Sequence, residues 1–110
     1  MNFIRLITAI FFSVLFFNNS FALDCNRTVS AAVTVQYNCD DNDSLTVNSG
    51  VILDYDNNDV VEAQDTDGVT IINNGTIQND GNNFQAPIDG SATRNLTVTN
   101  NGTINATKRY

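Results

Sequence analysis

The sequence predicts an all-β parallel solenoid of about three short coils, because it repeats, alternates and turns at regular intervals. Residues 69–78 and 96–105 have nearly the same sequence, VTIINNGTIQ and LTVTNNGTIN. A weaker copy, LTVNSGVI at residues 45–52, precedes them, and we match its Gly50 with Gly75. The interval between these copies is typical of one coil of a solenoid.

Within each repeat the residues alternate as they do along a β-strand. Val69, Ile71 and Ile77 fall on one face, whereas Thr70 and Thr76 fall on the other. Stacked coils would form ladders of Ile and Val inside and Thr outside, with Asn side chains able to hydrogen-bond along the stack. We therefore expect three apolar pairs to be buried between neighbouring coils: Ile71 with Val98, Ile77 with Ile104, and Val61 with Ile88.

Asn-Gly dipeptides mark a tight bend in each of the two strong repeats, at Asn74-Gly75 and Asn101-Gly102. Asn and Gly reach positive φ at the lowest cost. The same dipeptide between alternating apolar residues is also a hairpin signal, so an antiparallel hairpin protein is the alternative. Each unit also has a second short apolar stretch, which favours the solenoid. This stretch lies farther from the bend in the second copy than in the first, and the difference accounts for the longer distance from the second copy to the third.

Residues 1–22 are predicted to be a secretory signal peptide that is removed after Ala22. Arg5 gives the positive start, residues 6–17 form an almost wholly apolar run, and Ser20 and Ala22 are small residues at the two positions that a signal peptidase reads. About 20 apolar residues are needed to span a bilayer, so this run is too short for a membrane anchor. We expect a mature chain that is secreted or held at the cell surface and does not span a membrane.

Cys25 and Cys39 are the only cysteines, and export makes a disulfide between them the expected state. A metal site would need two more ligands, and the chain has no His, so we expect no cofactor. The bond would close a loop of about 15 residues and stabilise the fold by roughly 3 kcal/mol.

The mature chain is acidic, since all 12 acidic residues but only four of the five basic residues follow Ala22. Nucleic acid and anionic membranes are poor partners for it, because both bind clustered Lys and Arg. Asn and Thr are abundant, helix formers are scarce, and Pro87 is the only proline, which favours strands joined by polar turns.

The strings VTIINNGTIQ and LTVTNNGTIN, with APIDG between them, resemble the repeating unit of bacterial autotransporter passenger domains. The resemblance covers residues 45–107 and implies a right-handed parallel β-helix that is displayed at, or released from, the outer surface. That family carries a C-terminal β-barrel translocator in the outer membrane, whereas this sequence stops at Tyr110 with no barrel. We interpret the chain as the signal peptide and first rungs of such a passenger.

Three segments are predicted: the signal peptide at 1–22, an N-terminal cap with the disulfide at 23–44, and the solenoid repeats at 45–110. The cap would stop the first edge from pairing with another copy. The last repeat ends without a second strand or a closing cap, so we expect self-association or partial disorder from about residue 90 onward.

The acidic turn that begins at Asp54 is the candidate metal site, with Asp54, Asp56, Asn58 and Asp59 as weak calcium ligands. Carboxylates and Asn carbonyls are the hard ligands that calcium prefers. The turn departs from a helix-loop-helix calcium loop, because Asp59 stands where that loop requires Gly. A solvated acidic turn is the simpler interpretation.

Asp54 with Asp56, and Asp65 with Asp67, are spaced to share one face of an extended segment, and some β-helix hydrolases cut polysaccharides with such carboxylates. The chain has no His for proton transfer and no Trp to stack on a sugar. We therefore predict a non-enzymatic exported scaffold, for which the autotransporter resemblance implies adhesion or cell contact. Its expected partners are a host or neighbouring cell surface or other solenoid copies. The alternatives are a polysaccharide-active enzyme fragment and a calcium-binding structural module.

Overall fold

The computed structural model describes residues 21–81 and 84–107, and every regular element in those ranges is a β-strand. The predicted all-β class is confirmed for this part of the chain. It contains no helix, and so none that is long and apolar enough to cross a membrane. The signal peptide predicted for residues 1–22 lies outside the described ranges except for Phe21 and Ala22.

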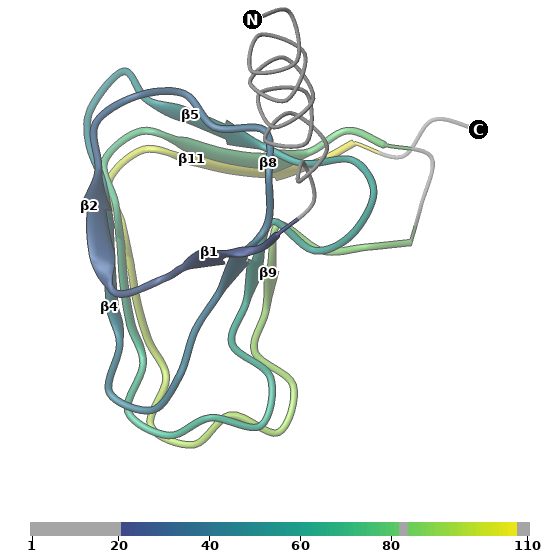
Figure 1. The fold of residues 1–110 in the computed structure, drawn as a ribbon. Helices are drawn as coiled ribbons and strands as arrows, with labels where there is room; N and C mark the ends of the chain where they lie inside the picture. The colour runs from purple at the N-terminus through teal and green to yellow at the C-terminus, as the bar shows by residue number, and fades with distance from the viewer. Residues whose placement is uncertain (1–20, 82–83, 108–110) are drawn as a thin grey trace, which may run out of the picture.

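The strands are short and follow one another around the molecule in chain order (Figure 1). Thr and Ile are the commonest residues in them, because β-branched side chains fit a pleated, half-buried surface. The strands are β1 (Leu23–Asp24), β2 (Arg27–Val29), β3 (Tyr37–Asn38), β4 (Ser44–Val47), β5 (Ile52–Asp54), β6 (Val61–Glu62), β7 (Thr70–Asn73), β8 (Thr76–Asn79), β9 (Ile88–Asp89), β10 (Thr97–Asn100) and β11 (Thr103–Ala106).

All the strand pairings among the described residues are parallel, and the strands form three sheets. The sheet orders are β1-β3-β6-β9, β10-β7-β4-β2 and β11-β8-β5. β7 and β8, which flank the Asn74-Gly75 bend, lie in different sheets, so the antiparallel hairpin alternative is wrong. Parallel strands need a crossover between them, and here the crossover is a round of the chain through the other sheets.

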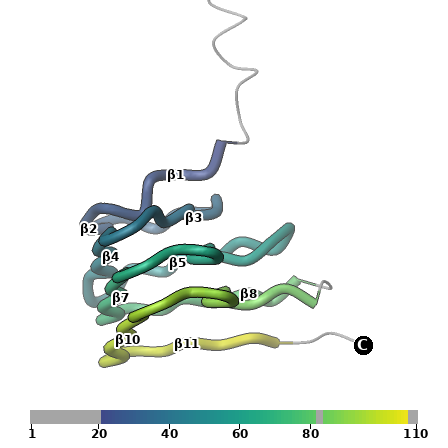
Figure 2. The backbone as a smooth tube through the Cα atoms, turned by 90° about the horizontal axis from the view of Figure 1, so that it is seen from below, coloured from purple at the N-terminus to yellow at the C-terminus, as the bar shows by residue number. Residues whose placement is uncertain are grey.

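We call one such round of the chain a circuit. The second circuit contains β4, β5 and β6, the third contains β7, β8 and β9, and the last contains β10 and β11. Successive circuits follow nearly the same outline end-on (Figure 1) and lie at successive levels from the side (Figure 2). β2 and β3 form the first circuit, and β1 pairs with β3 from the level before it, so the strands of residues 23–44, the expected cap, extend the same sheets.

The three predicted apolar pairs are neighbours in the parallel ladders. The pairs are Val98 with Ile71, Ile104 with Ile77, and Ile88 with Val61. Ile71, Ile77 and Val61 are fully buried and belong to one hydrophobic core that runs along the inside of the circuits. The intervening Thr70 and Thr76 are partly exposed, as the alternation predicts.

The other member of each pair is less buried than the sequence predicts. Val98 keeps 42% of its surface exposed and Ile104 keeps 36%, while Ile88 is only partly buried. β9, β10 and β11 are the outermost strands of their sheets, and no further strand among the described residues covers them. A ladder residue is buried by the circuits on both sides of it, so the last circuit keeps apolar surface in contact with water.

The weak repeat at residues 45–52 pairs in a different register from the predicted one. Leu45 pairs with Ile71, and Ile52 pairs with Thr76. The match of Gly50 with Gly75 instead predicts Thr70 opposite Leu45 and Ile77 opposite Ile52, so each observed pairing differs from it by one residue, and the two differences have opposite directions. The bend between β4 and β5 is longer than the bend between β7 and β8. Gly50 lies in the longer bend with a φ of 78°, so matching it with Gly75 is wrong.

A disulfide joins Cys25 and Cys39, as predicted, with 4.7 Å between their Cα atoms. Both side chains are buried. Cys25 follows β1 and Cys39 follows β3, and these two strands pair with each other. The bond therefore fastens β1, the first strand among the described residues, to the sheet that the later circuits extend.

Candidate functional site

Three carboxylates converge where the second and third circuits leave the β11-β8-β5 sheet. Asp54 is the last residue of β5, Asp56 follows it closely, and Asp80 comes directly after β8. β5 and β8 are parallel neighbours, so the residues that follow them meet at the same edge. Ligand oxygens from the three side chains all lie within 4.8 Å of one another. We call Asp54, Asp56 and Asp80 the acidic cluster.

Hydrogen bonds satisfy only part of the acidic cluster. The Gln78 side-chain amide donates to Asp54 Oδ2 at 3.0 Å, whereas Asp54 Oδ1 is buried and has no hydrogen-bond partner. A hydrogen bond with Asp80, loss of hydration and the nearby charge of Asp54 all raise the pKa of Asp56. Asp56 therefore takes up a proton more readily than an isolated aspartate does.

Two of the four predicted calcium ligands, Asp54 and Asp56, belong to the acidic cluster. Asn58 and Asp59 instead make contacts that hold their loop against the third circuit. The Asn58 carbonyl accepts a hydrogen bond from the Asn79 side chain at 2.9 Å, and Asp59 Oδ1 accepts one from a backbone N–H of the third circuit at 2.5 Å. Asp59 is also buried, which places its carboxylate inside the loop.

Asp80 belongs to the acidic cluster, but matching the internal repeats by their glycines does not predict this. The ladder pairs Asp54 with Gln78, so the same register carried past the strand ends sets Asp56 beside Asp80. Matching the glycines of the two bends instead sets Asp56 against Gly81. The extra length of the bend at 48–51 is the signal that corrects the register.

The acidic cluster presents carboxylate oxygens, which are the ligands that a hard cation such as calcium prefers. Asp54 and Asp56 lie on one circuit and Asp80 lies on the next, so a cation or a shared proton there would join the two circuits. Chemically, the cluster is therefore suited to binding positive charge.

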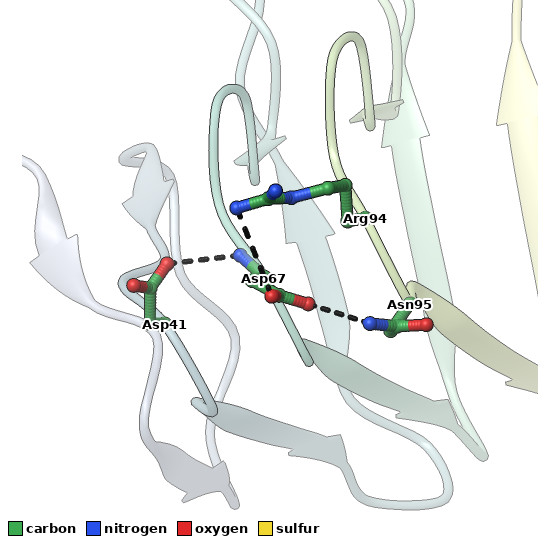
Figure 3. Close-up of polar contacts among 4 residues, drawn as sticks. All are labelled: Asp41, Asp67, Arg94 and Asn95. Carbon is green, nitrogen blue, oxygen red and sulfur yellow. Dashed lines mark hydrogen bonds and ion pairs between the residues drawn. The ribbon is translucent and has the colours of Figure 1, made fainter.

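A chain of polar contacts crosses three circuits at another corner, with Asp67 at its centre (Figure 3). The Asp67 N–H donates to Asp41 Oδ1 at 2.9 Å, and Asn95 Nδ2 donates to Asp67 Oδ1 at 2.8 Å. The Arg94 guanidinium lies 3.9 Å from Asp67 Oδ2. Asp67 therefore connects neighbouring circuits. In the predicted Asp65–Asp67 pair, the carboxylate of Asp67 is already engaged in these structural contacts.

The same corner repeats one backbone conformation in successive circuits. Asn42, Gly68 and Asn95 occur once in each of three circuits and have φ values of 62°, 77° and 53°. Asp65 and Ala92 share a second such position in successive circuits, with φ values of 59° and 55°. Positive φ suits Gly, Asn and Asp but strains Ala. Ala92 is thus the one residue at these positions whose type opposes its conformation.

At the corner between β7 and β8, asparagines hydrogen-bond along the stack, as predicted. Asn73 is fully buried, and its Nδ2 donates to Asn100 Oδ1 at 2.9 Å and to the Thr103 carbonyl at 2.8 Å. Beside it, Asn101 Nδ2 donates to Asn74 Oδ1 at 2.9 Å. Buried polar groups must be paired, so this corner is stable only when the next circuit supplies the partners.

Comparison of the sequence with models of known families, with curated proteins and with solved structures finds no match. The function is therefore argued from three features of the molecule: the parallel ladders, the acidic cluster and the hydrogen-bonded corners.

Proposed function

We propose that the chain is a right-handed parallel β-helix of the autotransporter-passenger type, exported as a non-enzymatic scaffold for adhesion or cell contact. The observation that carries the proposal is the set of three parallel sheets through which the chain passes in rotation. Each circuit adds a strand in register to its sheet, and a fold built in this way repeats the same outer side chains along its length.

Two observations support the right-handed sense. In Figure 1 the chain runs up through β4, across through β5 and then down the opposite side, which is clockwise, while Figure 2 has the N-terminal circuits on the side nearest the viewer of Figure 1. Clockwise travel away from the viewer is right-handed. Crossovers between parallel strands have this hand in about 98% of cases.

The disulfide and the charge support export. Disulfides persist in oxidising compartments and are rare in the cytosol, and the Cys25–Cys39 bond lies in the first circuit, close behind the predicted cleavage site. The net negative charge after Ala22 favours solubility outside the cell.

The outward side chains of the middle strands support a contact role. Thr70 and Thr76 are partly exposed and lie in register with Thr97 and Thr103 of the last circuit. These hydroxyl groups form uncharged, regularly spaced rows that can donate and accept hydrogen bonds. Such rows match a partner that is itself repetitive, as the carbohydrate-rich surface of a cell is.

Export is tested by expressing the full chain in a Gram-negative bacterium and separating the cell fractions. The expected result is a chain that begins at Leu23, found in the periplasm or the medium and detected by its intact mass. An uncleaved chain in the cytosol would overturn the export proposal.

Adhesion is tested with the mature, oxidised chain coupled to beads that are incubated with bacterial or host cells. The matched control carries Thr70→Glu and Thr76→Glu, which change the outer rows and leave the inward residues in place. Wild-type beads are expected to capture cells and control beads to lose capture. Equal capture by the two would contradict adhesion through these rows, even with the β-helix intact.

A calcium-binding structural module is the second candidate, favoured by the convergence of Asp54, Asp56 and Asp80 on two circuits. Calorimetric titration of the mature chain with calcium tests it, with Asp80→Asn as the control. Heat of binding from the wild type that the variant loses would favour this candidate, and its absence from the wild type would remove it.

A further inference from the structure

The tetrapeptide Asn-Asn-Gly-Thr occurs twice at the same corner of the fold, at residues 73–76 and at residues 100–103. It joins β7 to β8 in the third circuit and β10 to β11 in the last. The two copies have the same local chemistry, but one lies between two circuits and the other lies on the outermost circuit of the described residues. Any difference in their reactivity therefore comes from their surroundings.

The Asn-Gly bond inside each copy can react with itself. Glycine has no side chain to hinder its backbone nitrogen, so that nitrogen can attack the side-chain amide carbon of the asparagine before it. The attack requires the glycine N–H to leave its hydrogen bond and the asparagine side chain to rotate toward it. A corner that holds both groups in place therefore suppresses the reaction.

The inner copy is held in this way. The Gly75 N–H donates to Asn73 Oδ1 at 3.1 Å, and Asn73 is fully buried. Two further hydrogen bonds from Asn73 Nδ2, to Asn100 and to Thr103 of the last circuit, keep that acceptor in position. Gly75 is itself buried, so its nitrogen is covered as well as bonded.

The outer copy lacks this protection. Asn101 and Gly102 are exposed, and the Gly102 N–H donates to Asn100 Oδ1 at 3.3 Å, a longer bond in an exposed position. Asn100 and Thr103 accept hydrogen bonds from the Asn73 side chain, but no circuit among the described residues lies beyond Asn100 to accept hydrogen bonds from it in the same way. The Asn101 side chain is held by one hydrogen bond, from its Nδ2 to Asn74 Oδ1.

We propose that Asn101 is a site of selective self-deamidation and that Asn74, in the same tetrapeptide, is protected from it. The Gly102 nitrogen bonds to Asn101 Cγ, the bond from Cγ to Nδ2 breaks, and ammonia leaves with the proton that Gly102 gives up through solvent. The product is a five-membered cyclic imide. Water then adds to either carbonyl of the ring and opens it to aspartate or to isoaspartate.

Both products weaken the corner at which they form. Each replaces the Asn101 amide, which donates to Asn74, with a carboxylate that has no proton to donate at neutral pH. Isoaspartate also inserts a methylene into the backbone beside Gly102, where even a single added Cβ would collide with the Gly75 carbonyl. Deamidation at Asn101 therefore loosens the last circuit from the third, whatever function the scaffold serves.

The test uses the oxidised mature chain, kept dilute at neutral pH and body temperature and sampled over weeks. Peptide mapping by mass spectrometry gives the rate at each asparagine, and enzymatic methylation of isoaspartate identifies that product. Asn101 is expected to convert about tenfold or more faster than Asn74, because only the inner corner must open before it reacts. In concentrated urea the two rates are expected to become equal.

The urea experiment is the internal control, since it removes the fold and keeps both tetrapeptides. An Asn101→Gln variant, which keeps an amide at the corner but forms the cyclic imide poorly, is expected to lose the fast phase and leave the slow Asn74 phase unchanged. Equal rates in the folded protein, a faster rate at Asn74, or a folded protein that does not react at Asn101 would each overturn the proposal.

Discussion

The carboxyl groups of Asp56 and Asp80 belong to different circuits and have oxygens within 4.8 Å of each other, and a hydrogen bond between them raises the pKa of Asp56. The bond follows from the register of β5 and β8, which sets the residues after the two strands side by side. Two aspartates can share a hydrogen bond only when one of them carries a proton. The pair therefore links the protonation of an exposed loop to the stacking of two circuits.

The Asp80→Asn substitution is expected to stabilise the protein at neutral pH and to lose that advantage in acid. The pKa of Asp56 is raised in the folded chain, so its favourable contribution is complete below the unfolded pKa and is lost as pH rises through the folded pKa. Above that range Asp54, Asp56 and Asp80 repel one another, and the variant removes one of the three charges. Urea unfolding across a pH series measures the difference.

The control is Asp40→Asn, which removes an exposed acid from a turn outside the acidic cluster. Its difference from the wild type should vary less with pH than that of Asp80→Asn. Identical pH profiles for the wild type and Asp80→Asn would show that the three carboxylates do not interact.

Ile77→Ala should destabilise the fold far more than Ile104→Ala, although the two residues are partners in one ladder. Ile77 is fully buried between circuits, and truncating such a residue costs about 2–4 kcal/mol. Ile104 already keeps a third of its surface exposed, so less apolar area is lost. Thermal or urea unfolding of the two variants gives the comparison. Equal losses would mean that Ile104 is covered in solution.

Ala92→Gly is expected to stabilise the protein. Ala92 has a φ of 55°, a conformation that costs a residue with a Cβ about 1 kcal/mol or more. Glycine adopts it without strain, although it loses more chain entropy on folding, so a net gain of roughly 0.5–1 kcal/mol is expected. The melting temperature of the variant measures the gain.

Gly68→Ala provides the opposite case at the same corner. Gly68 has a φ of 77°, and an added Cβ would lie 2.6 Å from Asn42 Oδ1, so both strain and crowding are introduced. We expect a loss of stability from this variant. A corner that tolerated both changes equally would not depend on positive φ.

The Cys25–Cys39 bond should be present in the protein isolated without reductant, so alkylation should label no thiol. Replacing both cysteines with Ala should cost about 3 kcal/mol, because the bond closes a short loop in the unfolded chain. The loss is expected as a lower urea midpoint, with cell capture retained below that midpoint. Two labelled thiols in the untreated protein would refute the bond.

The sequence predicts the ladders best where two units share the same bend. Matching the two strong repeats pairs Val98 and Ile104 correctly with Ile71 and Ile77, because the third and last circuits have bends of equal length. The match fails at Leu45, because the longer bend of the second circuit shifts the strands on its two sides in opposite directions. Matching Gly50 with Gly75 gives a register midway between the two observed ones, so it predicts neither pairing correctly.

The candidate site is only half visible in the sequence for the same reason. Asp54 and Asp56 stand close together in the chain, but Asp80 joins them only through the correct register of β5 and β8. The corner positions with positive φ are also present in the sequence, as Asn42, Gly68 and Asn95. Gly and Asn permit a positive φ but do not require one, because the conformation of the whole turn determines it.

No strand among the described residues lies beyond β10, so its outer edge is available to a second copy of the chain. Residues 97–107 contain no charged residue and no proline, which are the usual protections of an edge strand. By contrast, Asp24 lies in β1 and Arg27 lies in β2, at the other end of the described residues. Thr97 N–H bonds inward to Val69, so the N–H of Val98, the next residue, points toward the open edge.

We therefore expect the mature chain to associate as its concentration rises, and Val98→Pro to prevent this. Proline removes the outward N–H, and an edge strand tolerates it there because no bond to β7 is lost. Val98→Ala is the matched control, since it also removes the apolar side chain but keeps the N–H and should still associate, more weakly. Sedimentation over a wide concentration range measures all three proteins. A wild-type chain that stays monomeric, with strong hydrogen-exchange protection across residues 96–105, would show that this edge needs no partner.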